Sequence, residues 1–222
     1  MNLRLSLVFF LVVVAIFSTG CAKKFNEKQY DKRPVSEDHK KSKQEDFYTH
    51  TVEYGDTLYA LFGINWKIVA RINRVSPKSL RPGMKLLVPH DMNRAMDSHQ
   101  PLPSYIDKDV ELIVDLDEQV IGVYRNRELI VWYPISSGKT GHKTPTGYYR
   151  ISTKIENYSS NTYPKPDGGA PMPYAMRFYG PYWIHGGELP GKPGSKGCIR
   201  LMSLDAKELY EKTRVGDSIL IK

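Results

Sequence analysis

Residues 110–136 read VELIVDLDEQVIGVYRNRELIVWYPIS, and this stretch indicates the fold of the C-terminal half of the chain. Runs of β-branched and aromatic residues are separated by polar turns at 117–119 and 126–127. Such runs are typical of short strands joined by tight turns. The pattern therefore predicts a β-rich structure.

The residues that follow extend this pattern to the end of the chain. We expect one helix, at 203–212, where Ser203 can serve as the N-cap and Leu204, Leu209 and Tyr210 can pack against the core. The last residues, DSILIK at 217–222, predict a closing strand. These features predict a sandwich-like or barrel-like domain at 109–222, in a chain whose overall class is α+β.

Within this domain, residues 185–201 read HGGELPGKPGSKGCIRL and contain Cys198. Positive neighbours lower the pKa of a thiol, and Lys196 and Arg200 flank this cysteine, while a protonated His185 could act in the same way. A thiolate attacks carbonyl groups, so Cys198 is the candidate nucleophile. The alternative is a surface turn around a buried, unreactive cysteine.

A nucleophilic cysteine needs a base within hydrogen-bond reach. His185 is the favoured base, because it ends an apparent strand, PYWIH, and the glycines after it allow a sharp turn. His142, in the loop SGKTGHKTPTG, is the competing candidate. Every histidine of the chain precedes Cys198, which excludes the papain-like order of cysteine first and histidine later.

Acyl transfer also needs N–H donors for the tetrahedral oxyanion. Gly197 and Cys198 supply consecutive backbone amides in one turn, and glycine permits the backbone geometry that this requires. Three other candidate residues each have two interpretations. Ser195 either tunes the site or only forms the turn, and the aromatic residues Tyr174 and Trp183 either line a substrate cleft or pack in the core.

Several separated pieces of this region together resemble the L,D-transpeptidase, or YkuD-like, catalytic domain. They are SSGKTGHKTPTGYYRI, GGAPMPYAMRF, the HG pair at His185 and SKGCIRL around Cys198. The resemblance covers about residues 109–222 and implies that fold. It also implies a cysteine-dependent acyltransferase of cell-wall remodelling.

The resemblance assigns roles to individual residues. It makes Cys198 the nucleophile and His185 the base, and it lets the Gly186 carbonyl orient the imidazole. Gly197 and Cys198 would form the oxyanion hole. Arg200 would hold the loop or a substrate carboxylate.

The implied reaction begins with attack of the Cys198 thiolate on a tetrapeptide stem of peptidoglycan. Terminal D-alanine leaves, a thioester remains, and an amine of another stem then forms a 3-3 cross-link. Water as the acceptor would give an L,D-carboxypeptidase instead, and a domain without activity would be a wall-binding tether. Two departures from the family pattern are visible: Lys196 stands where many members have a second histidine, and the spacing from His185 to Cys198 is slightly short.

A second module precedes this domain and reads THTVEYGDTLYALFGINWKIVARINRVSPKSLRPGMKLLVP at 49–89. Its βααβ order, its GDTL turn and its RPGMKLLVP ending resemble a LysM module at 48–91, with a shortened first helix. Turn and periodicity signals predict the following elements. They are a strand at 49–54, a turn and N-cap at 55–57, a short helix, a second helix at 66–73 and a strand at 85–88.

LysM modules bind glycans that contain N-acetylglucosamine, such as peptidoglycan. The resemblance places the binding groove near Asp56, Thr57 and Arg81. The alternative for Asp56 and Thr57 is that they only cap the first helix.

The N-terminus, MNLRLSLVFFLVVVAIFSTGC, has a basic residue, an apolar run and small residues before Cys21. The apolar run is shorter than the ~20 residues of a membrane span and fits a secretory signal at 1–20. Its end resembles a bacterial lipobox, which implies that Cys21 carries lipid. A plain secretory signal or an uncleaved anchor is the alternative. With Cys21 lipidated, Cys198 has no disulfide partner.

Two polar segments connect these parts. Residues 21–47 carry charges of both signs and few aliphatic residues, which predicts a flexible tether, and 92–108 predict a linker. We therefore expect a lipid-anchored, periplasm-facing protein of the cell envelope. Ala22 follows Cys21 where aspartate often signals retention in the inner membrane, so the outer membrane is favoured.

Composition limits the classes of partner that the protein is expected to bind. The formal net charge is +8, but acidic residues are spread throughout, so the chain is not a purely basic nucleic-acid-binding tail. Cysteine and histidine spacings do not match a metal site, and we expect neither a metal ion nor a cofactor. The expected partners are peptidoglycan and, through the lipid, a membrane.

Overall fold

A computed structural model of the chain describes residues 46–98, 100–165 and 168–222. The predicted signal peptide, Cys21 and all but the end of the predicted tether lie outside these residues. Contacts join the described residues of both modules into one compact unit. The helices of the described residues all lack the length and apolar composition of a membrane span.

The first module is a two-stranded antiparallel sheet with short helices beside it. The register of the sheet runs from Phe47 opposite Pro89 to Thr51 opposite Lys85. This order confirms the βααβ prediction, and the five residues of α2 agree with a shortened first helix. The elements are β1 (Phe47–Thr51), α2 (Leu58–Phe62), η2 (Gly63–Asn65), α3 (Trp66–Asn73), η3 (Pro77–Ser79) and β2 (Lys85–Pro89).

Local chemistry explains where these helices begin and end. Helix α2 begins at the predicted cap, since the Ala60 N–H donates to Thr57 Oγ1 at 3.1 Å. Helix α3 ends at Arg74, whose φ of 56° is left-handed. The Asn73 side chain then joins α3 to β2, because it donates to the Leu87 carbonyl and accepts from the Leu87 N–H.

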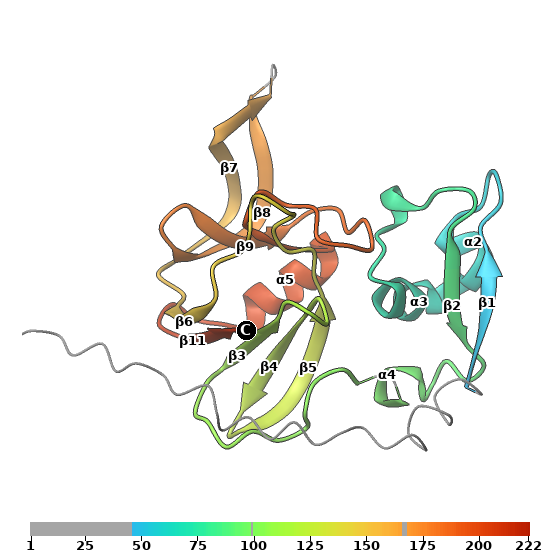
Figure 1. Ribbon diagram of the computed structural model, residues 1–222, viewed down its shortest axis with the longest axis horizontal. Helices are drawn as coiled ribbons and strands as arrows, with labels where there is room; N and C mark the ends of the chain where they lie inside the picture. Colours follow the sequence, from blue (N-terminus) through green and yellow to red (C-terminus); the bar gives the residue numbers. More distant parts are fainter. Residues whose placement is uncertain (1–45, 99, 166–167) are drawn as a thin grey trace, which may run out of the picture. The chain divides into compact units, whose positions relative to one another are not determined.

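The second module contains two sheets (Figure 1). One has the strand order β5-β4-β3-β11-β6 and the other the order β10-β9-β8-β7. Helix α4 (Ala95–Ser98) precedes them in the chain. The strands are β3 (Leu112–Asp115), β4 (Val120–Arg125), β5 (Glu128–Pro134), β6 (Gly147–Arg150), β7 (Thr153–Lys165), β8 (Gly168–Tyr179), β9 (Tyr182–Gly186), β10 (Ile199–Leu201) and β11 (Ser218–Ile221).

Strand pairing follows the predicted turns at one end of the larger sheet. The polar turns at 117–119 and 126–127 connect β3 to β4 and β4 to β5, and both pairs are antiparallel. Strand β11 also lies where a strand was expected. It inserts between β3, with which it is parallel, and β6, with which it is antiparallel.

The main core of this module lies between the two sheets and helix α5 (Ser203–Lys212). Ile121 and Tyr133 come from the five-stranded sheet, Met176 and Ile184 from the four-stranded sheet, and Leu209 from α5. All five side chains are fully buried. This packing fixes strands β9 and β10, whose ends carry the candidate catalytic residues.

Helix α5 has the predicted bounds but not the predicted cap. Its N-cap is Met202, without a side-chain hydrogen bond, and Ser203 is the first helical residue. Leu204 is 53 % exposed. The expected cap and the packing of Leu204 were wrong, because Leu204 lies off the buried face. The expected packing of the other two residues is confirmed, since Leu209 is fully buried and Tyr210 packs against the same core.

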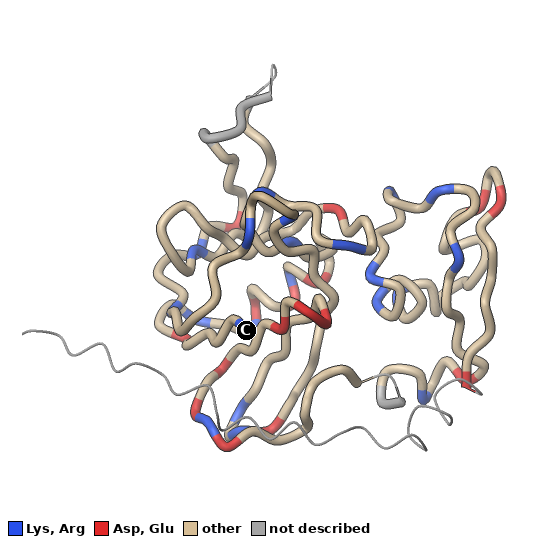
Figure 2. The backbone as a smooth tube through the Cα atoms, viewed as in Figure 1, with Lys and Arg blue, Asp and Glu red and all other residues tan. Residues whose placement is uncertain are grey.

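Charge is distributed over the described residues of both modules. Figure 2 shows Lys and Arg interspersed with Asp and Glu along the backbone rather than gathered in one stretch. The arrangement fits the sequence-based expectation that the net positive charge is not that of a basic tail.

Candidate active site

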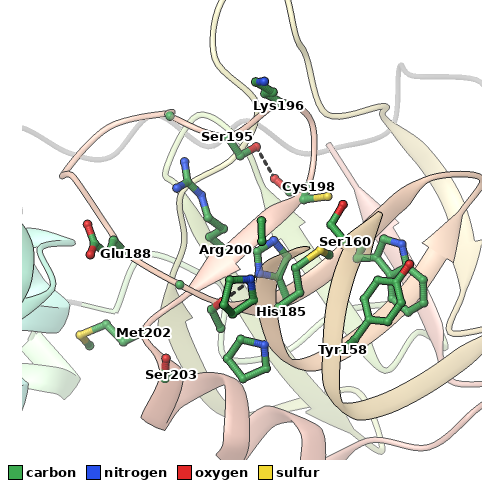
Figure 3. Close-up of a pocket in the computed structure, with 18 of the residues that line it drawn as sticks. Tyr158, Ser160, His185, Glu188, Ser195, Lys196, Cys198, Arg200, Met202 and Ser203 are labelled. Carbon is green, nitrogen blue, oxygen red and sulfur yellow. Dashed lines mark hydrogen bonds between the residues drawn. The ribbon is translucent and has the colours of Figure 1, made fainter. Parts of the chain in front are cut away.

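A cavity of about 1140 Å³ gathers most of the candidate catalytic residues. Its lining includes His185 and Gly186 from β9, Arg200 from β10, and Ser195 and Cys198 from the loop between those strands. Figure 3 shows Cys198, Arg200 and His185 around the same space. The fold thus brings together the HG pair at His185 and the SKGCIRL segment around Cys198.

Parallel pairing of β9 and β10 explains this convergence. His185 lies opposite Arg200, and Ile184 lies opposite Ile199. Cys198 directly precedes β10, so the thiol is presented at the beginning of one strand while the imidazole is presented near the end of its neighbour. The loop at 187–198 is therefore a crossover that returns the chain to the same edge of the site.

The imidazole of His185 is held in one orientation. Its Nδ1 lies 2.8 Å from the Gly186 carbonyl oxygen, and the side chain is 7 % exposed. A carbonyl only accepts, so in the neutral ring Nδ1 carries the proton and Nε2 has the free lone pair. This bond agrees with the role that the resemblance gives to the Gly186 carbonyl.

Burial lowers the pKa of His185 to about 4. The hydrogen bond to Gly186 opposes this decrease, and the charge of Arg200 adds to it. The ring is therefore neutral at pH 7 and able to accept a proton. A protonated His185 does not contribute to ionisation of the thiol in the resting site.

Burial also raises the pKa of the Cys198 thiol above its ordinary value. A backbone hydrogen bond from Trp183 and the charge of Arg200 act in the opposite direction but do not reverse the shift. Arg200 thus lowers the thiol pKa as expected of a flanking cation, but burial outweighs this effect in the resting site. The sequence showed the nearby cations, whereas the loss of water around the sulfur depends on the packed fold.

The turn before Cys198 depends on a glycine. Gly197 has a φ of +109°, and a Cβ at this position would lie 2.4 Å from a ring carbon of Tyr182. Its N–H donates to Ser195 Oγ at 3.0 Å, and its carbonyl accepts from Thr144 Oγ1 at 2.9 Å. The Gly197 N–H is therefore already bonded within the turn. Of the two expected oxyanion donors, the Cys198 N–H is the one left to bind the oxyanion.

Ser195 is both a lining residue and a structural one. It is 5 % exposed, and its Oγ donates to the Cys198 carbonyl while it accepts from Gly197. Backbone bonds to Ser137 and Lys139 hold the same residue. These contacts favour the interpretation of Ser195 as the residue that forms the turn.

Arg200 presents a cation to the cavity without a carboxylate partner. Among the described residues no Asp or Glu lies within ion-pair distance of it, and its Nε is buried without a hydrogen bond. Burial lowers the pKa of Arg200, which the charges of Cys198 and Glu188 oppose. A guanidinium in this state favours a carboxylate or another anionic ligand.

The two candidate aromatic residues lie in different places. Trp183 lines the cavity and stacks on Tyr158 with ring centroids 4.5 Å apart. Tyr174 is not among the lining residues. It packs against the main core, 5.9 Å from the ring of Tyr210, so its position supports the core interpretation.

Candidate glycan-binding residues of the first module make local bonds. Thr57 caps α2, and Asp56 accepts from the Glu53 N–H at 2.7 Å and lies 3.5 Å from His50 Nε2. The Arg81 guanidinium donates to the carbonyls of residues 78 and 80. None of the three lines the large cavity.

Sequence reasoning missed two groups of residues. Thr144 supports the turn before Cys198, because it bonds both Gly138 and Gly197 at 2.9 Å, and the KTPTG motif around it was the available signal. The first module also reaches the cavity. It contributes Trp66, Ser76, Pro77 and Lys78, for which the sequence held no signal.

His142, the competing base, is exposed and also lines the cavity. The structure therefore brings both histidines to the site, and only His185 is buried and oriented. Within the described residues, no group of three or more His, Cys, Asp and Glu side chains is placed to hold a metal ion.

Comparison with known families identifies both modules of the chain. The model of the L,D-transpeptidase catalytic domain matches residues 109–221, and the LysM domain model matches residues 50–89. The chain therefore belongs to the L,D-transpeptidase family and carries an N-terminal LysM domain. This is a family of cell-wall enzymes that act on peptidoglycan.

Two relatives from Bacillus subtilis (strain 168) support this membership. The protein named "Putative L,D-transpeptidase YkuD" is 28 % identical over 179 residues, which are 78 % of this chain and 98 % of that protein. The protein named "Putative L,D-transpeptidase YqjB" is 33 % identical over 126 residues, which are 50 % of this chain and 65 % of that protein.

Solved structures share the fold. The L,D-transpeptidase from Xylanimonas cellulosilytica aligns with a TM-score of 0.54 and 18 % identity over 78 % of this chain and 98 % of that one. The L,D-transpeptidase from Stackebrandtia nassauensis aligns with a TM-score of 0.50 and 22 % identity over 59 % of this chain and 65 % of that one. At these identities the likeness concerns the fold alone.

Proposed function

We propose that this protein is a cysteine-dependent L,D-transpeptidase that cross-links peptidoglycan stems through a thioester on Cys198. The observation that carries the proposal is the shared cavity of Cys198 and a neutral His185 whose Nδ1 is tied to Gly186. A neutral imidazole with a free Nε2 is the state that a general base requires.

The first half of the reaction forms the acyl-enzyme. As the sulfur attacks the carbonyl carbon between the L- and D-centres of a tetrapeptide stem, the thiol proton passes to His185 Nε2. The tetrahedral oxyanion takes a hydrogen bond from the Cys198 amide. The carbon–nitrogen bond then breaks, His185 returns the proton to the leaving D-alanine amine, and a thioester remains.

The second half transfers the acyl group. An amine of another stem loses a proton to His185 and attacks the thioester carbon, the carbon–sulfur bond breaks, and the thiol regains its proton. The product is a 3-3 cross-link. Since thiol and imidazole are both neutral at rest, substrate attack rather than a preformed ion pair drives the first proton transfer.

Arg200 and Trp183 fit substrate-binding roles in this scheme. Arg200 has no carboxylate partner among the described residues and would bind a carboxylate of a stem, while Trp183 would contact its apolar portions. Asp56, Thr57 and Arg81 are proposed sugar contacts of the LysM domain. Lipidation at Cys21, export by residues 1–20 and an outer-membrane position complete the proposal.

Muropeptide mass spectrometry tests the reaction. The protein and its Cys198→Ala variant are incubated with peptidoglycan sacculi, with and without a supplied amine. We expect 3-3 cross-linked products from the first and none from the second. Cross-linking or trimming by Cys198→Ala would refute the proposal, and trimmed stems alone in the presence of amine would show a carboxypeptidase.

Trapping with a carbapenem separates a catalytic domain from an inactive tether. An active site acylates at Cys198, which adds the mass of the β-lactam to the intact protein. A mass unchanged after prolonged incubation would favour the wall-binding tether, in keeping with Lys196 at a position where many members have histidine.

A further inference from the structure

The LysM domain supplies part of the wall of the catalytic cavity. Trp66 begins helix α3, and Pro77 and Lys78 lie in the following turn η3, with Ser76 directly before it. All four line the same cavity as Cys198 and His185. These residues lie outside the motifs that carry the transpeptidase resemblance.

Hydrogen bonds in both directions fix this wall to the catalytic loop. The Ser76 N–H donates to the Leu189 carbonyl at 3.0 Å, and the Leu189 N–H donates to Ser76 Oγ at 3.2 Å. The Gly191 N–H donates to the Arg74 carbonyl at 3.1 Å. Because Leu189 and Gly191 lie between His185 and Cys198, the LysM wall keeps its place next to the reacting groups.

Side-chain packing supports the same conclusion. Leu189 and Met202, which flank Cys198 in the sequence, belong to one buried cluster with the LysM residues Leu58, Val69 and Leu86. Figure 3 shows Met202 on the side of the cavity away from Tyr158. The shared cluster indicates that two catalytic-domain side chains complete the LysM core.

A buried ion pair adds a further attachment. Arg71 of α3 donates to Asp205 Oδ1 of α5 from both Nη2, at 2.6 Å, and Nε, at 3.1 Å. Asp205 is 2 % exposed, so the pair is largely withdrawn from water.

The side chains that the LysM domain contributes to the cavity, together with those around them, favour binding of an amphipathic anion. Lys78 is an exposed cation on the cavity, and Arg177, Lys196 and Arg200 add positive charge around the same space, against Glu188 as the acidic lining residue. Trp66 is half-buried and presents an aromatic surface beside Lys78. Aromatic surface next to a cation is typical of sites that bind ligands with both apolar faces and carboxylates.

We propose that Trp66 and Lys78 form a substrate subsite of the transpeptidase cleft, which binds the peptidoglycan strand that bears one of the reacting stems. Lys78 pairs with a stem carboxylate, and Trp66 packs against the adjoining sugar–peptide junction. This inference rests on the proposed function. It gives the LysM domain a direct part in the transfer reaction as well as in attachment to the bacterial cell wall.

A charge reversal with a matched control tests the subsite. Lys78→Glu is compared with Lys85→Glu, which reverses an exposed charge on LysM strand β2 outside the cavity. Both variants are made in the full chain and assayed with a soluble disaccharide-tetrapeptide and an amine acceptor. We expect Lys78→Glu to raise KM about five- to tenfold and Lys85→Glu to leave it unchanged.

A second substrate identifies which part of the strand is bound. Free tetrapeptide without sugar is compared with the disaccharide-tetrapeptide for the wild type, Lys78→Glu and Trp66→Phe. Lys78→Glu should weaken both substrates because it acts on the carboxylate. Trp66→Phe should reduce the preference for the sugar-bearing substrate, and an unchanged preference would overturn the role of Trp66.

Acylation by a carbapenem keeps the two proposals apart. Acylation uses Cys198 and His185, which are unchanged in both variants, so wild type, Lys78→Glu and Lys85→Glu should all reach full acylation at a saturating carbapenem concentration. Failure of the wild type to acylate would refute the proposed function. Normal acylation with KM values equal for Lys78→Glu and Lys85→Glu would refute the subsite alone.

Discussion

The LysM domain and the catalytic domain use their motif residues in different ways. In the LysM domain, Asp56 and Thr57 satisfy backbone groups within a few residues of themselves. In the catalytic domain, His185 comes from β9 and Cys198 from the loop directly before β10, and both line one cavity. A motif residue that hydrogen-bonds within its own turn already has a structural role that explains it. A motif residue that distant elements bring to a cavity has no such local role, so its position favours a chemical one.

The largest expected effect falls on the base in the catalytic domain. His185→Gln should lower the rate of transfer about 100- to 10,000-fold, because a neutral amide cannot accept the thiol proton. The measurement is the steady-state rate with a disaccharide-tetrapeptide. His142→Gln is the matched control, and a larger loss in that variant would make His142 the base.

The pH dependence sharpens the same contrast. The folded-state pKa of His185 is about 4, below its ordinary value of 6.5, so the neutral base is present above about 4 and lost below it. Transfer rates should therefore fall about tenfold per pH unit below that value. An acid limb near 6.5 in the kcat/KM profile would contradict the buried, neutral imidazole.

The same shift makes a prediction about stability. Between pH 6.5 and about 4 the unfolded chain binds a proton at His185 that the folded chain does not. The free energy of unfolding should consequently decrease as the pH falls through this range. Denaturant titrations of wild type and His185→Gln at several pH values would check this, since the variant lacks this contribution.

A smaller effect is expected where the two domains meet. Ser76→Ala removes the acceptor of the buried Leu189 N–H, which should cost about 1–3 kcal/mol of unfolding free energy and slow acylation of Cys198. Ser79→Ala is the control, because Ser79 bonds the same hydroxyl at 3.0 Å but leaves the Leu189 bond intact. Equal acylation rates in the two variants would show that the LysM wall does not position the loop.

The smallest effect separates a cap from a sugar contact. Thr57→Ala should lower the unfolding free energy by about 1 kcal/mol, and Thr57→Ser should restore most of it because serine keeps the capping oxygen. If Thr57 is only a cap, both variants should bind sacculi normally while folded. A loss of binding in folded Thr57→Ala would assign the hydroxyl to the glycan as well.

Much of the fold could be predicted because its signals are local. The helix bounds at 66–73 and 203–212, the cap at Thr57 and the turns of the β3-β4-β5 meander all depend on residues a few positions apart. The insertion of β11 between β3 and β6 could not be predicted in this way. Its partners lie far away in the sequence, and pairing over such distances is set by the packed core.

The candidate site likewise has features that the sequence predicts and features that depend on long-range packing. The sequence by itself determined which residues are candidates for the chemistry, since Cys198, His185 and the glycines around them form a recognisable pattern. Only the tertiary structure decided their state. Burial makes both thiol and imidazole neutral at rest, and Ser195 takes up the Gly197 amide. The LysM domain reaches the cavity through Trp66 and Lys78, because desolvation and contact depend on neighbours that packing brings together from distant parts of the chain.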